Sequence, residues 1–151
     1  MGRKIIYIVI ALLLVSIAAV VLINFIPSQT TIEDEMANYE DEFGEITSLQ
    51  IVQESNERSD SSRREVVLED RDEIMALFEQ GNETELVSND RAPTVNYHLE
   101  IETTEHSVYT APTIIVSDVT FAYGESRFHV NGTNFLLEAI ETGDFDWDYD
   151  E

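Results

Sequence analysis

The chain has 151 residues, of which 31 are acidic, eight are basic and none is cysteine. Without cysteine it forms no disulfide and uses no thiol chemistry, so burial alone has to stabilise its fold. The acidic excess repels phosphate groups and so disfavours a nucleic-acid partner. Apolar residues make up 43% of the chain, enough to form a core, and the length beyond the first 27 residues suits one domain.

The most apolar stretch is residues 5–26, IIYIVIALLLVSIAAVVLINFI, which contains no charged residue. As a helix it would be about 33 Å long at ~1.5 Å per residue, and the hydrocarbon core of a bilayer is ~30 Å thick. We therefore expect residues 1–27 to form a transmembrane signal anchor. The alternative is a signal peptide cleaved near Ser16 and Ala18, but cleavage there would leave an apolar new N-terminus.

Charges on the two sides of this stretch predict its orientation. Arg3 and Lys4 precede it, whereas acidic residues follow it from Glu33 onward. Positive residues stay on the cytoplasmic side of a membrane. The pattern predicts a single-pass protein of the cell membrane with a cytoplasmic N-terminus and an extracytoplasmic C-terminal domain.

Residues 28–45 are predicted to form an acidic amphipathic helix next to the anchor. Thr30 and Glu33 fit a capping box at its start, and Gly44 is a stop signal at its end. Two interpretations of its apolar stripe stay open, because the stripe either covers the core of the domain or docks a neighbouring membrane protein. The stripe follows the spacing of one helix face and consists of Ile32, Met36, Tyr39 and Phe43.

Residues 46–143 are expected to fold as an α+β domain, an antiparallel sheet covered on one face by helices. Alternating apolar residues predict strands at residues 46–54, 63–69, 85–88, 95–103, 107–111, 113–123 and 127–131. The polar residues 55–62 predict a loop.

Two helices are predicted within this domain. The first covers residues 70–80, where Asp70 caps the start and Ile74, Leu77 and Phe78 form the core face. The second is ambiguous, because the Asn-Gly pair at the start of residues 131–143 is a hairpin signal, whereas the later apolar residues fit a helix face. We favour the helix.

The tail, residues 144–151, alternates acidic residues with Phe145, Trp147 and Tyr149. Its Asp-x-Asp-x-Asp start is similar to a calcium loop, but it lacks the glycine at loop position 6 and the glutamate at position 12. Three interpretations stay open: a weak calcium site, a final edge strand, or a solvated tail that a partner captures.

No catalytic signature is present: the chain has no HExxH zinc motif, no Gly-x-Ser-x-Gly elbow and no phosphate-binding glycine loop. His98, Glu100 and Glu102 share one strand face, and His106 or His129 would have to complete a metal site with them. Residues on one strand face lie ~6.6 Å apart, so a solvated face is the favoured interpretation. We predict no catalytic residue, no cofactor and no metal site.

All acidic residues lie beyond residue 32, and Lys4 is the only lysine. This composition is typical of an exterior at high salt or high pH, and the alternative is a surface for a cationic partner.

We predict a non-enzymatic, membrane-anchored accessory or binding module with a protein partner in the membrane or cell envelope. The alternative is an envelope sensor or immunity-type protein that binds a cationic ligand. The candidate partner-docking residues are Ile32, Met36, Tyr39, Phe43, Phe145, Trp147 and Tyr149.

Overall fold

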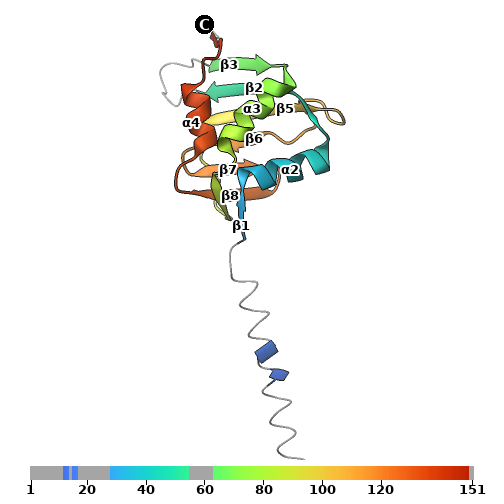
Figure 1. Ribbon diagram of the computed structural model, residues 1–151, viewed down its shortest axis with the longest axis vertical. Helices are drawn as coiled ribbons and strands as arrows, with labels where there is room; N and C mark the ends of the chain where they lie inside the picture. The colour runs from blue at the N-terminus through green and yellow to red at the C-terminus, as the bar shows by residue number, and fades with distance from the viewer. Residues whose placement is uncertain (1–11, 14, 17–27, 55–62, 150–151) are drawn as a thin grey trace, which may run out of the picture.

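The structure, a computed structural model, describes residues 12–13, 15–16, 28–54 and 63–149. The described residues form a nine-stranded antiparallel sheet with three helices (Figure 1). The helices are α2 (Ile32–Phe43), α3 (Arg71–Gly81) and α4 (Phe135–Thr142). The strands are β1 (Gln29–Thr31), β2 (Ile46–Glu54), β3 (Arg63–Leu68), β4 (Glu85–Ser88), β5 (Tyr97–Thr103), β6 (Ile114–Val116), β7 (Thr120–Tyr123), β8 (Ser126–Asn131) and β9 (Asp148–Tyr149).

The strands follow the order β1-β4-β8-β7-β6-β5-β2-β3-β9, and each neighbouring pair is antiparallel. The central strand β5 shows the alternation that its sequence predicts, because Tyr97, Leu99 and Ile101 are buried. Between them His98 and Glu100 are half-buried, and Glu102, which follows Ile101, is exposed. One face of the sheet therefore holds the core, and the other carries polar side chains.

The three helices pack on the core face, with α3 between α2 and α4 (Figure 1). Helix α3 approaches α4 closely at Gly81, where an added Cβ would lie 2.8 Å from the Cβ of Leu136. The core cluster draws side chains from all three helices and from the sheet, and its largest fully buried members are Tyr39, Phe78, Tyr97 and Phe121. Residues from Ile32 to Ile140 thus share one core.

Polar side chains cap the start of each helix. The Thr31 hydroxyl accepts from Asp34 N–H at 3.3 Å, so the cap of α2 lies one residue after the predicted Thr30. Asp70 accepts from Asp72 N–H at 2.8 Å, and Asn134 accepts from Leu137 N–H at 3.1 Å. Helices are present in the three places where they were predicted, residues 28–45, 70–80 and 131–143, with shorter bounds in the first and last.

The connection between β4 and β5 crosses the face that the helices leave open. It has to pass β8, β7 and β6, because these strands separate its two ends. Thr94 N–H donates to the Thr120 hydroxyl at 3.3 Å, and Thr120 pairs with the exposed His129 on that face. Residues 89–96 therefore cover part of the polar face.

The prediction of a transmembrane anchor needs correction. Within the ranges that the structure describes, no helix is long and apolar enough to cross a membrane. This finding contradicts the fold class with an N-terminal transmembrane helix and the single-pass topology with a cytoplasmic N-terminus and an extracytoplasmic domain. Most of the predicted anchor, residues 1–11, 14 and 17–27, lies outside the described residues, as does the loop predicted for residues 55–62.

Two strand predictions are also wrong in detail. Residues 107–111 form a turn, in which Ser107 C=O accepts from the N–H groups of Thr110 and Ala111, both at 2.9 Å. The stretch 113–123 is a hairpin, because the chain turns at residues 117–119 between β6 and β7. At the second turn the Ser117 hydroxyl accepts from Val119 N–H at 3.3 Å, a local side-chain bond that favours a turn over a continued strand.

Candidate functional site

A groove of about 240 Å³ lies between α2 and α3, on the helical side of the molecule. The two helices run in opposite directions: Glu40 near the end of α2 contacts Arg71 at the start of α3, at 3.1 Å. At the other end, Ile32 N–H donates to the C=O of Thr84, three residues after α3, at 3.2 Å. The groove is lined by Glu33, Met36, Ala37, Glu40, Ile46, Met75, Glu79 and Asn82.

The floor of the groove is apolar and carries two methionines. Met36 is buried against the core, Met75 is half-buried, and Ala37 and Ile46 complete the surface. Methionine has three rotatable bonds and a polarizable sulfur, so a methionine surface adapts to apolar groups of different shapes. This floor suits contact with an apolar side chain better than coordination of an ion.

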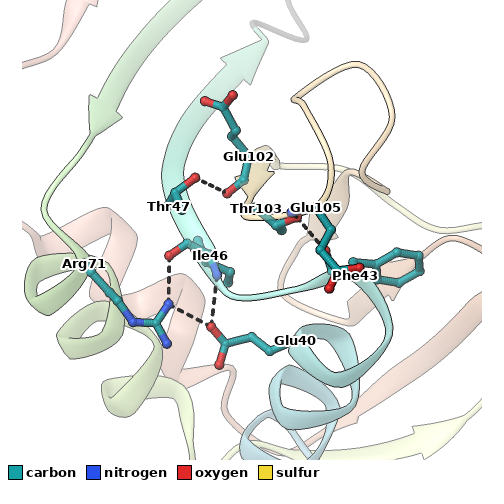
Figure 2. Close-up of polar contacts among 8 residues, drawn as sticks. All are labelled: Glu40, Phe43, Ile46, Thr47, Arg71, Glu102, Thr103 and Glu105. Carbon is teal, nitrogen blue, oxygen red and sulfur yellow. Dashed lines mark hydrogen bonds and ion pairs between the residues drawn. The ribbon is translucent and has the colours of Figure 1, made fainter.

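A polar cluster around Glu40 and Ile46 lies at one end of the groove, and Figure 2 shows its contacts. Glu40 Oε1 accepts from Ile46 N–H at 3.1 Å and lies 3.1 Å from Arg71 Nη1, which also donates to Ile46 C=O at 2.8 Å. Gly44, with φ at +91°, allows the chain to turn sharply from α2 into β2. The cluster joins α2, β2 and α3, and it uses the arginine closest to the groove to compensate Glu40.

The connection from α2 to β2 is also held on β5. The Thr103 hydroxyl donates to Phe43 C=O, and the Thr47 hydroxyl donates to Glu102 C=O at 3.2 Å (Figure 2). These bonds fix the end of α2 relative to the sheet. The groove is therefore a preformed feature of the packed helices.

The other end of the groove is acidic. Glu33 on α2 and Glu79 on α3 are exposed at its rims, and neither forms an ion pair among the described residues. The N-terminus of α2 and the C-terminus of α3 lie together at this end, and their opposite helix dipoles offset each other, so the negative charge comes from the two carboxylates. A cation at this end would meet two carboxylates.

A second groove, of about 230 Å³, lies beside β1 and β4. Its polar groups already bond one another, because Asn131 Nδ2 donates to Glu85 at 2.9 Å and the Thr31 hydroxyl donates to Asp34 at 3.2 Å. Its floor has no counterpart to the methionine pair, since Leu86 is its only core residue. We therefore consider it the weaker candidate.

One carboxylate of α2, that of Glu35, is buried and lines neither groove. Glu35 is 7% exposed, and the Tyr123 hydroxyl donates to it at 2.8 Å. The Tyr39 hydroxyl donates to Pro112 C=O at 2.8 Å. Burial raises the pKa of both tyrosines, and the adjacent Glu35 carboxylate raises that of Tyr123 further. The two tyrosine hydrogen bonds therefore connect α2 to β7 and to the loop before β6.

The structure places the predicted docking residues mainly in the core. Ile32, Met36 and Tyr39 are buried and Phe43 packs partly buried against the core, as the first interpretation of the α2 stripe expects. Phe145 and Trp147 of the tail also pack partly buried against the core. Met36 also lines the groove. Of the tail aromatics, Tyr149 is 65% exposed in the short edge strand β9. A docking role for this set stays a prediction.

The three histidines do not come together. His98 and His129 lie on β5 and β8, which are three strand positions apart, or about 14 Å at ~4.8 Å per strand. His106 packs against the Phe43 ring at the end of α2, with centroids 5.8 Å apart. In the described part of the chain, the tail aspartates up to Asp148 included, no three His, Asp or Glu side chains are placed to hold a metal ion.

Sequence reasoning did not find the groove, although part of its signal is visible. Glu33, Ala37 and Glu40 recur at helical spacing, and Glu79 follows Met75 by four residues. The pattern on each helix alone resembles an ordinary solvated helix face, and the groove appears only when α2 and α3 pack side by side.

Comparisons of the chain with protein-family models, with curated proteins and with solved structures found no match.

Proposed function

We propose that this chain is a non-enzymatic binding module that recognises a positively charged segment of a protein partner. The observation that carries the proposal is an acidic surface with little internal compensation. The described residues contain two ion pairs, Arg63–Glu65 at 3.0 Å and Arg71–Glu40 at 3.1 Å. The remaining carboxylates in this part of the chain are mostly exposed and create a negative field that attracts cationic partners.

The size and lining of the two grooves favour binding over catalysis. Small-molecule sites are usually clefts of ~300–1,000 Å³ with a few convergent polar groups, whereas these grooves measure about 240 and 230 Å³. Glu35, the buried carboxylate, faces Tyr123 and lines neither groove. A groove of this size suits one or two side chains of a protein partner.

A protein partner explains the groove better than a free cation does. A hard cation such as Ca²⁺ would use the carboxylates of Glu33 and Glu79 but not the thioethers of Met36 and Met75, because hard cations take oxygen ligands. A protein segment uses both, because apolar side chains contribute burial while lysine or arginine contributes charge complementarity. The acidic surface would then speed encounter with the partner, and the groove would hold it.

The proposal is tested by direct binding of the full-length chain to labelled peptides, followed by fluorescence anisotropy. One peptide is a helix-forming sequence of leucine, alanine, lysine and arginine, and its counterpart has glutamate at each basic position. In about 0.1 M NaCl we expect the basic peptide to bind at least about tenfold more tightly, and about 1 M NaCl to weaken its binding. Equal affinity for the two peptides, or no binding of either, would contradict the proposal.

A further inference from the structure

We infer that the groove between α2 and α3 receives a short amphipathic helix of the partner. One aliphatic side chain of this helix packs on Met36 and Met75, and a lysine or arginine one turn away lies between Glu33 and Glu79. The inference rests on the proposed function, and it adds the place of contact, the conformation of the partner and its direction.

The shape of the groove selects a helix. Two antiparallel helices form its walls, and Glu33 to Glu40 spans seven residues, about 10 Å or two helical turns. Helices dock in such grooves through anchors spaced three, four and seven residues apart. An extended segment would need a free strand edge to pair with, and the edge strands β1 and β9 lie at the two ends of the sheet.

The charge of the groove sets the direction of the bound helix. Arg71 compensates Glu40 at one end, whereas the uncompensated carboxylates of Glu33 and Glu79 make the other end negative. The basic residue of the partner therefore lies near Asn82, and the apolar anchor lies towards Ile46. A peptide in which the basic residue and the apolar anchor exchange places would put its positive charge beside Arg71.

Substitution of the two rim carboxylates tests the charged end. We expect Glu33→Gln with Glu79→Gln to weaken binding of the basic peptide by about tenfold or more. The matched control is Asp41→Asn with Glu73→Gln, which removes the same charge from exposed positions of the same two helices outside the groove. We expect the control to weaken binding by less than about threefold, the share due to the general field.

Substitution of the floor tests the apolar anchor. In Met75→Lys the lysine stem would fill the groove and its amine would neutralise the rim, so we expect binding to be lost. Ala76→Lys is the control, because it adds the same charge at the neighbouring exposed position of α3. Thermal melts of each variant check that the fold is retained before binding is compared.

The conformation of the partner is tested with the peptide itself. A peptide of about 14 residues is used, because shorter helices are marginal in water, and a second version carries proline at its centre. Proline breaks a helix interior, so we expect the proline peptide to bind about tenfold more weakly or worse.

The outcomes separate this inference from the proposed function. If the wild-type chain binds the basic peptide but the rim variant and its control lose affinity equally, the groove is overturned and the binding module stands. Equal effects of Met75→Lys and Ala76→Lys would overturn it in the same way, and undiminished binding of the proline peptide would exclude a helix. If the wild-type chain binds no basic peptide, the proposed function itself fails.

Discussion

At the scale of single residues, the buried tyrosines of α2 and β7 tie stability to pH. Tyr39 donates to Pro112 C=O and Tyr123 donates to Glu35, so both hydroxyls are held protonated in the folded protein. Burial raises the pKa of each above the ordinary value of ~10, which the unfolded chain keeps. Above pH ~10 the unfolded state loses these protons first, so it binds fewer protons than the native state.

We therefore expect the free energy of unfolding of the full-length chain to fall as pH rises above ~10, and to be unaffected by these two groups below it. Urea denaturation at pH ~8, ~10 and ~11 measures this. Tyr39→Phe removes one of the two titrating groups and should make the decline shallower, although it also loses a hydrogen bond at every pH. A decline as steep as that of the wild-type chain would show that Tyr39 is not responsible.

At the scale of elements, α3 is the helix that holds the helical layer together, because it contacts both α2 and α4 as well as β2 and β3. Leu77 is 3% exposed on its core face. We expect Leu77→Ala to lower the free energy of unfolding by about 2–5 kcal/mol, the usual cost of emptying such a site. Gln80→Ala, at an exposed position of the same helix, should change it by less than ~0.5 kcal/mol. A loss as small for Leu77 as for Gln80 would contradict its place in the core.

The helices and the central strands were predictable because each carries its own local signal. Asp70 and Asn134 cap their helices, and the alternation along β5 separates Leu99 from its polar neighbours. The Asn-Gly pair served a different purpose from a hairpin: Asn131 ends β8, and Gly132, with φ at +102°, leads the chain into α4. Local signals of this kind locate an element but do not show what it packs against.

The features that sequence reasoning missed depend on contacts between distant segments. The groove is lined by Met36 from α2 and Met75 from α3, and the Glu40–Arg71 ion pair joins the two helices at one end of it. Within the described residues, β9 pairs with β3 at Asp148 and Tyr149, and the guanidinium of Arg64 lies 4.3 Å from the centre of the Trp147 ring. An edge strand was one of three interpretations of the tail sequence, but no local pattern distinguished it from a calcium loop or a solvated tail.

At the scale of the whole molecule, added salt should stabilise the fold but weaken binding of a cationic partner, because both depend on the negative charge of the surface. The chain has 31 acidic residues against eight basic ones, so repulsion among exposed carboxylates disfavours the compact state. Salt reduces the Debye length from ~10 Å at 0.1 M to ~3 Å at 1 M and should relieve this repulsion. The same screening weakens attraction to a cationic partner.

We expect the full-length chain to melt at a higher temperature in about 1 M NaCl than in about 0.1 M NaCl, in thermal melts followed by circular dichroism. Calcium chloride at millimolar concentration is the control, because a specific site for the divalent ion would stabilise far more than sodium at equal ionic strength. A lower melting temperature in high sodium would contradict the repulsion argument. Stability would then depend on the ion pairs Arg63–Glu65 and Arg71–Glu40, which salt weakens, and Arg71→Gln should abolish part of the salt effect.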